Sequence, residues 1–322
     1  MTIYLVSIIV GLAVLTWSAD RFIAGASVTA RSLGVPPLIV GLTVVGIGTS
    51  LPEMLVSTMA ALDGNAGIAV GNAIGSNIAN VGLILGITAL ITPLTVSSGL
   101  LRRELPMLLL ITAVVAVLLL DLQVGRLEGG LLLLGMLAVV VWMGWQAQRS
   151  DEPPDVIGAE FEETIPSDVP LSRALLWLVA GLALLLASSR LLVWAAVGVA
   201  EALGVSDLVI GLTIVAVGTS LPELAAGIAS ARHGEHDIAI GNIIGSNMFN
   251  LLAVLGIAGA IAPFALERVA LVRDYSIMAA LTVLFAAMAF GLRGPGRITR
   301  IEGGLLLAAF AGYQGLLFAS GR

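Results

Sequence analysis

Long apolar segments alternate with short polar or glycine- and proline-containing breaks along the whole chain. A helix needs roughly 20 apolar residues to cross a bilayer, and these segments are near or above that length. Only 11% of the residues are charged, whereas a soluble domain carries about 25%. The pattern therefore predicts an all-α integral membrane protein with ten transmembrane helices, at residues 3–31, 36–62, 66–91, 101–120, 127–147, 171–203, 207–232, 238–262, 269–292 and 301–319.

The two halves of the chain have related sequences. GVPPLIVGLTVVGIGTSLPE, from Gly34, aligns with GVSDLVIGLTIVAVGTSLPE, from Gly204, and GNAIGSNIAN, from Gly71, aligns with GNIIGSNMFN, from Gly241. The paired positions are 170 residues apart, and about 29 of the 60 positions from Gly34 to Pro93 are identical. Because each half has an odd number of spans, the second copy crosses the membrane in the opposite direction. Such inverted five-helix repeats are typical of secondary transporters, which bind substrate near the midplane where the copies meet.

This organisation predicts a first repeat over residues 1–148, a linker over 149–170 and a second repeat over 171–322. The linker is acidic and contains prolines, which is typical of a solvated segment; a regulatory cation site on its carboxylates is the alternative. Loops on the linker side contain nine arginines and loops on the other side contain four. The positive-inside rule then places the linker in the cytoplasm and both termini outside, and we expect the protein in the inner (plasma) membrane.

The composition excludes several functional classes. All fifteen basic residues are arginines and the net charge is −6, so no basic patch exists for nucleic acid. The chain has no cysteine, which excludes disulfides, thiol catalysis and thiolate metal sites. We expect the lipid bilayer as surroundings, with no resident cofactor and no obligate protein partner.

The repeated motif GTSLPE, at Gly48 to Glu53 and Gly218 to Glu223, places polar groups inside apolar segments. Pro52 has no N–H to donate to the carbonyl of Gly48, so its ring disturbs the helix and frees backbone oxygens. Freed oxygens are tolerated at membrane depth only where the segment is buried in protein or lines a wet cavity. Together with the nearby hydroxyls and the glutamate, these are hard oxygen ligands suited to Na⁺, Ca²⁺ or Mg²⁺.

The two glutamates are the strongest indication of a cation site. A charged residue at mid-helix costs about 2.5 to 3.5 kcal/mol on insertion scales unless something pairs with it. No arginine lies in the same span as Glu53, and Glu223 has none before Arg232. A protonated glutamate that hydrogen-bonds a neighbouring helix is the alternative. Two carboxylates that meet at the midplane would repel each other unless a divalent ion, or at least two monovalent ions, lay between them.

The second motif, GSNxxN, in which two residues separate GSN from a final asparagine, adds neutral oxygens. Glycines at GxxxG spacing let helices approach closely, but the serines and asparagines are too many for simple packing. Serine and asparagine four positions apart share one helical face, so we expect them to complete the shell without adding charge. These residues are Ser76, Asn77 and Asn80 in the first copy and Ser246, Asn247 and Asn250 in the second.

The paired GTSLPE and GSNxxN segments resemble the alpha-repeats of the cation/calcium antiporters, a family that includes the sodium/calcium exchangers. The resemblance implies ten transmembrane helices, with the second, third, seventh and eighth forming the ion site and the first and sixth sliding across them. It implies a Ca²⁺ site with Glu53 and Glu223 as carboxylate ligands and Thr49 and Thr219 beside them. It implies flanking Na⁺ sites at Ser50, Ser76, Ser220 and Ser246, with carbonyl oxygens near Gly46 and Ala216, and further polar ligands at Asn80 and Asn250.

The sequence differs from the potassium-dependent members of this family at one position. Some members have an aspartate at the place of Asn250, and its absence here argues against potassium co-transport. The predicted function is antiport of Na⁺ against Ca²⁺, and exchange of H⁺ for Ca²⁺ or another divalent cation on the same scaffold is the alternative. An intramembrane hydrolase is less consistent with the sequence, because the two histidines, His233 and His236, lie beyond the seventh span, far from the GTS segments. A passive channel is less consistent with inverted, broken-helix repeats.

Overall fold

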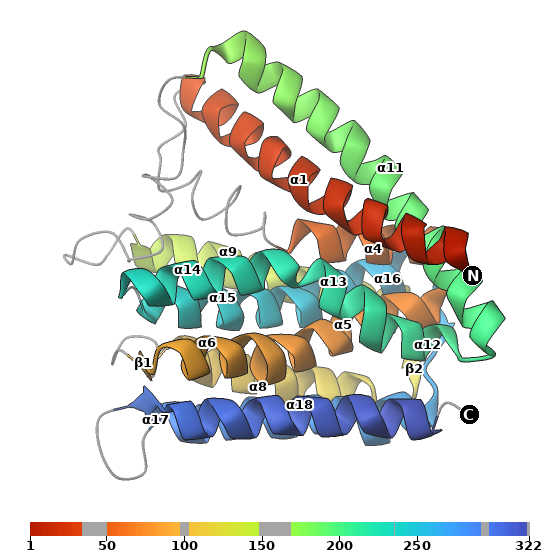
Figure 1. Cartoon of the computed structure of the whole chain (residues 1–322), viewed down its shortest axis with the longest axis vertical. Helices are drawn as coiled ribbons and strands as arrows, with labels where there is room; N and C mark the ends of the chain where they lie inside the picture. Colours follow the sequence, from red (N-terminus) through yellow and green to blue (C-terminus); the bar gives the residue numbers. More distant parts are fainter. Residues whose placement is uncertain (34–49, 97–102, 148–168, 235, 291–295, 321–322) are drawn as a thin grey trace.

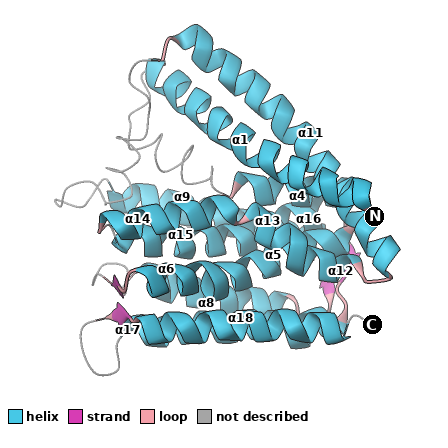
Figure 2. Ribbon diagram, viewed as in Figure 1, coloured by secondary structure: helices cyan, strands magenta, loops and turns pink. Residues whose placement is uncertain are grey.

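The computed structural model describes residues 1–33, 50–96, 103–147, 169–234, 236–290 and 296–320 (Figure 1). These residues are almost all helical, with short strands at the two ends of a helical bundle (Figure 2). The first half contains α1 (Thr2–Ser32), α4 (Leu51–Leu62), α5 (Ala66–Ala79), the π turn η2 (Asn80–Leu85), α6 (Gly86–Ile91), α8 (Glu104–Leu118) and α9 (Arg126–Ala147). The second half contains α11 (Leu171–Leu203), α12 (Asp207–Ile210), η3 (Gly211–Val215), α13 (Ala216–Thr219), α14 (Leu221–His233), α15 (His236–Phe249), η4 (Asn250–Val254), α16 (Leu255–Ile261), η5 (Ala270–Tyr275), α17 (Ser276–Phe290) and α18 (Arg300–Ser320).

The described helices make this a multi-pass membrane protein. Seven are long and apolar enough to cross a bilayer, and the count is eight if the bent pair Asp207–Thr219 and Leu221–Arg232 is taken as one span. The shorter apolar helices α4 and α8 fall within the second and fourth predicted spans. Residues 66–91 and 171–203 are helical over their full predicted lengths. The predicted residues 36–49 of the second span lie outside the described residues, so the total of ten spans stays a prediction.

The two copies of the GSN motif lie on the most deeply buried helices. In the helix formed by α5, η2 and α6, 78% of an apolar stretch of 18 residues is buried. In the helix formed by α15, η4 and α16, 83% of the corresponding stretch is buried. The other long spanning helices have 22% to 39% buried. Each central helix contains a π turn that begins at the last asparagine of the motif, Asn80 or Asn250. π turns are rare and occur frequently at functional sites, which draws attention to these two asparagines.

Helices α1 and α11 form a separate antiparallel layer along one side of the bundle (Figure 1). They approach closely at Gly25, where a Cβ atom would lie 2.5 Å from the backbone nitrogen of Leu178. Gly198 lies against the ring of Tyr4 in the same interface. These two small residues therefore let α1 and α11 pack closely against each other.

Two antiparallel strand pairs join the halves at opposite ends of the bundle (Figure 1). β1 (Leu94–Thr95) pairs with β4 (Arg297–Ile298), and β2 (Gln123–Val124) pairs with β3 (Phe264–Ala265). Each pair joins the segment after the third predicted span of one half to the segment before the fifth span of the other, so the contacts are reciprocal. Both chain termini lie at the end of the bundle where β2 lies (Figure 1).

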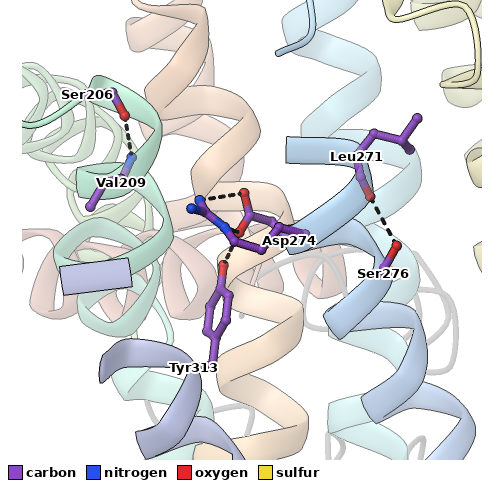
Figure 3. Close-up of polar contacts among 7 residues, drawn as sticks. Ser206, Val209, Leu271, Asp274, Ser276 and Tyr313 are labelled. Atoms are coloured by element: carbon purple, nitrogen blue, oxygen red, sulfur yellow. Dashed lines mark hydrogen bonds and ion pairs between the residues drawn. The ribbon is translucent and has the colours of Figure 1, made fainter. Parts of the chain in front are cut away.

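Two groups of polar contacts join neighbouring segments of these helices (Figure 3). The buried Asp274 carboxylate receives hydrogen bonds from the guanidinium of Arg273, at 2.7 and 3.1 Å, and from the hydroxyl of Tyr313, at 2.9 Å. The Ser206 side chain accepts a hydrogen bond from the backbone N–H of Val209, at 3.4 Å, and so caps α12. The Asp274 cluster joins the π turn η5 to α18 and satisfies a carboxylate that would be costly to bury alone.

Candidate cation site

Each copy of GTSLPE begins a new helix. In the second copy α13 ends at Thr219, α14 begins at Leu221, and the axis bends by 43° between them. Ser50, with φ −87° and ψ 3°, and Ser220, with φ −86° and ψ 7°, have nearly the same backbone conformation. The proline that follows is the second residue of its helix, where a missing N–H costs little. The break predicted from the proline is therefore confirmed in the second copy.

The break places Glu53 and Glu223 in the first turn of α4 and α14, and each side chain is 1% exposed. Helix N-termini favour negative charge, because backbone N–H groups there point outward unpaired. Ser220 donates to the Glu53 carboxylate at 3.4 Å, and Ser246 donates to the Glu223 carboxylate at 3.4 Å. Within the described ranges neither carboxylate forms an ion pair with a basic residue. Glu53 of the first copy is thus in contact with the GTSLPE motif of the second.

Asn72 joins the two copies near these carboxylates. Its amide nitrogen donates to the backbone oxygen of Glu53, at 3.1 Å, and to the hydroxyl of Ser57, at 2.9 Å. Its amide oxygen accepts from the hydroxyls of Thr219, at 3.2 Å, and Ser76, at 3.4 Å. Asn72 is fully buried, so these four contacts fix the relative positions of α4, α5 and α13.

Sequence reasoning did not include Asn72 or Ser57 in the site. Asn72 recurs as Asn242 in the second copy, and that repetition was a usable signal. Ser57 lies four positions after Glu53 on the same helical face, but its counterpart in the second copy is Gly227. Comparison of the two copies therefore gives no signal for Ser57.

The asparagines that end the GSNxxN motifs bond across the two copies. The amide nitrogen of Asn80 donates to the amide oxygen of Asn247, at 3.0 Å, and that of Asn250 donates to the amide oxygen of Asn77, at 3.0 Å. All four side chains are at most 2% exposed. The central helices are therefore joined by a reciprocal pair of amide contacts.

Five buried oxygen atoms of this cluster have no hydrogen-bond partner among the residues that the structure describes. They are Ser50 Oγ, Glu53 Oε2, Asn80 Oδ1, Glu223 Oε2 and Asn250 Oδ1. An unpaired buried polar group costs about 1 to 3 kcal/mol, more if it is charged. Hard oxygen atoms are the ligands that Na⁺ and Ca²⁺ prefer. Their chemistry therefore fits a cation bound between the copies.

The remaining predicted site residues are only partly described. The carbonyl oxygen of Ala216 accepts from the backbone N–H of Ser220, at 3.2 Å. It also lies 3.3 Å from the hydroxyl of Thr219, but that hydroxyl has a single proton and also lies within reach of Val215 O, at 3.0 Å, and Asn72 Oδ1, at 3.2 Å. A carbonyl oxygen has two lone pairs, so the Ser220 bond leaves one for an ion. Gly46 and Thr49 lie outside the described residues. His236 lies at the start of α15, where its ring is 2.7 Å from the hydroxyl of Thr95.

Known proteins match this chain over almost its whole length. The family model described as sodium/calcium exchanger protein matches residues 3–145 and 173–319. A protein named antiporter CaxA from Alkalimonas amylolytica is 48% identical over 320 residues, 99% of this chain and 100% of the relative. The inner membrane protein YrbG of Escherichia coli is 44% identical over 87% of each chain. The sodium/calcium exchanger MaX1 of Methanosarcina acetivorans is 31% identical over 99% of each.

The fold is also similar to a solved exchanger. A structure of the sodium-calcium exchanger NCX_Mj soaked with Na⁺ and Sr²⁺ matches with a TM-score of 0.65 and 31% sequence identity. The match covers 100% of this chain and 99% of that one. A second structure of the same exchanger, soaked with Na⁺ and Ca²⁺, matches with a TM-score of 0.63.

Proposed function

Because this chain belongs to the sodium/calcium exchanger protein family, we propose that it exchanges Na⁺ for Ca²⁺ across the membrane by alternating access at the site built on Glu53 and Glu223. Members of such a family transport ions, and we expect no enzymatic activity. The observation that supports the proposal best is the set of buried oxygen atoms without partners, which includes one oxygen from each glutamate. The absence of a basic partner for either carboxylate in the described part of the chain leaves the transported cation as the counter-charge.

The proposed ligands divide by charge. Glu53 and Glu223 would balance one Ca²⁺, whereas three or more Na⁺ would leave net positive charge and make transport respond to the membrane potential. Neutral oxygens would complete the shells without changing this balance. These are the hydroxyls of Thr49, Thr219, Ser50, Ser220, Ser76 and Ser246, the carbonyls near Gly46 and Ala216, and the amide oxygens of Asn80 and Asn250.

We further propose that the two repeats cross the membrane in opposite directions. The reciprocal strand pairs and the reciprocal asparagine contacts support this: each joins a position of one copy to a different position of the other, and the same contact recurs with the two copies exchanged. Both termini at one end of the bundle support an even number of spans, ten in this proposal. The arginine distribution then places the termini outside and the linker, residues 149–170, in the cytoplasm of a cell whose inner membrane holds the protein.

Uptake into liposomes tests the proposal. The purified protein is reconstituted with Na⁺ inside, diluted into Na⁺-free buffer with radioactive Ca²⁺ at constant pH, and assayed with a proton uncoupler present. We expect Ca²⁺ uptake that requires internal Na⁺ and continues with the uncoupler. Uptake that ignores Na⁺ but follows an imposed pH gradient would instead establish the alternative, exchange of H⁺ for Ca²⁺ or another divalent cation.

The same assay tests the two carboxylates. Glu53→Gln or Glu223→Gln removes half of the negative charge that balances Ca²⁺ while keeping the side-chain volume, so we expect Ca²⁺ exchange to be abolished. The matched control is Glu201→Gln, because Glu201 is an exposed glutamate near the end of α11, and it should transport like the wild type. Normal flux in either site variant would remove these glutamates from the mechanism.

A further inference from the structure

The amide groups of Asn80 and Asn250 have a defined orientation. An asparagine amide has one acceptor oxygen and one donor nitrogen, and rotation by half a turn exchanges their places. In both residues the nitrogen is committed to the partner copy, Asn80 to Asn247 Oδ1 and Asn250 to Asn77 Oδ1, at 3.0 Å each. The opposite side of each amide is therefore its oxygen, and both oxygens are buried without a hydrogen-bond partner in the described chain.

Asn77 is itself held in the orientation that accepts from Asn250. Its own amide nitrogen donates to the backbone oxygen of Asn247, at 3.2 Å, and lies 3.6 Å from the sulfur of Met278 on α17. If Asn77 turned over, its nitrogen would face the nitrogen of Asn250 and two donors would be left unpaired in a buried site. Because that arrangement costs the desolvation of both groups, the observed orientation is the stable one.

The orientation matters to a cation. An amide oxygen carries partial negative charge and coordinates Na⁺ or Ca²⁺, whereas the NH₂ group carries partial positive charge and repels them. Simple helix packing would not require either orientation, since the two have the same volume. The pairing also begins at the first residue of each π turn, Asn80 in η2 and Asn250 in η4, so the backbone and the amide are fixed at the same point.

We propose that Asn77 and Asn247 are positioning residues, which bind no ion themselves but hold the Asn80 and Asn250 amides with their oxygens towards the transported cation. This inference rests on the proposed function, because it concerns the same cation site. It assigns the polar residues of the GSNxxN motif two roles in each copy: the final asparagine is the ligand, and the asparagine three positions before it orients the ligand of the other copy.

A double-mutant cycle tests the inference. Asn77→Leu removes the acceptor for the Asn250 amide at nearly constant volume. Removal of such a supporting contact typically weakens metal binding by about 10- to 100-fold. Asn250→Asp replaces the amide by a carboxylate, whose two oxygens are equivalent, so either can face the cation without help. We therefore expect Asn77→Leu to weaken Ca²⁺ binding at least about 10-fold in the wild-type background and less than about threefold in the Asn250→Asp background.

The measurement is equilibrium binding of radioactive Ca²⁺ to purified protein in Na⁺-free buffer, with monodispersity on size-exclusion chromatography as the check on folding. The control is Thr282→Val, which removes a buried hydroxyl that bonds its own helix at Met278 O, 2.9 Å away. It should bind Ca²⁺ like the wild type. The same cycle in the other copy, Asn247→Leu with Asn80→Asp, applies if Asn77→Leu does not fold.

Four outcomes would overturn the inference. Equal losses in the two backgrounds, or no loss in either, would show that Asn77 does not act through the Asn250 amide. Variants of both copies that aggregate, with or without the aspartate, would assign these asparagines a purely structural role. Folded wild-type protein that binds no Ca²⁺ would remove the proposed function and this inference with it, whereas wild-type binding with a flat cycle would remove the inference alone.

Discussion

Replacement of Gly71 by alanine tests the close packing that positions the site. Gly71 lies on α5, where the helix crosses α12 and η3 with almost no space between the backbones. A Cβ atom there would lie 2.6 Å from the carbonyl oxygen of Leu208 and 2.8 Å from both the Cα of Gly211 and the nitrogen of Leu212, whereas ordinary contact begins at 3.4 Å. All three neighbours are backbone atoms, so no side-chain rotation can relieve the clash.

The expected cost follows from this geometry. The helices must separate by about 0.8 Å to restore ordinary contact, and such overpacking typically costs about 1 to 3 kcal/mol. Alanine returns about 1 kcal/mol through its higher helix propensity. Because the added methyl group would meet rigid backbone atoms of three residues, we take the upper end of the overpacking cost, about 3 kcal/mol. After the gain from helix propensity, we expect a net destabilisation of about 2 kcal/mol. The separation also carries the neighbouring Asn72 away from Thr219, whose contact is already 3.2 Å, so Ca²⁺ binding should weaken as well.

Thermal unfolding of the purified protein in detergent measures the first effect. We expect Gly71→Ala to melt about 3 °C or more below the wild type, since 1 kcal/mol corresponds to about 2 to 4 °C in chains of about 150 to 250 residues and to less in a longer chain. The control is Gly312→Ala on α18, an exposed helical position with no described atom within 4 Å of the added Cβ. It should melt at or slightly above the wild-type temperature. A Gly71→Ala protein with wild-type melting and wild-type Ca²⁺ affinity would refute the argument that backbone contact sets this interface.

Two further substitutions test contacts that lie outside the candidate cation site. Tyr313→Phe removes the hydrogen bond to the buried Asp274 carboxylate, at 2.9 Å, and should destabilise the protein by about 1.5 to 3 kcal/mol, measured as a lower melting temperature; an unchanged temperature would mean that Arg273 alone satisfies the carboxylate. Arg190→Gln breaks the ion pair with Asp63, at 3.4 Å, in which the Arg190 side chain is 69% exposed and the Asp63 side chain is 34% exposed. It should change the unfolding free energy by less than about 1 kcal/mol, and a larger loss would show that this pair carries structural weight despite its exposure.

The sequence by itself determined the local features of this protein. Hydropathy sets the ends of apolar helices, because each residue's transfer from water to lipid depends little on its distant neighbours. Residues 66–91 and 171–203 are accordingly helical over their full predicted lengths. The break in the seventh span was readable for a similar reason: the missing N–H of Pro222 acts on its own helix, and the axis bends there by 43°. The repetition of Glu53 as Glu223 marked two of the three carboxylates that the described fold buries; the third, Asp274, lies outside the repeated motifs.

Only the tertiary structure decided which polar groups meet. The contacts of Asn72 with Ser57 and Thr219, and the amide pairs between the copies, join residues up to 173 positions apart. They depend on the relative rotation and depth of helices, which no local pattern encodes. The packing decides which amide atoms meet a partner and which do not, so the roles of these asparagines as hub, ligand or positioning residue follow from the packed helices.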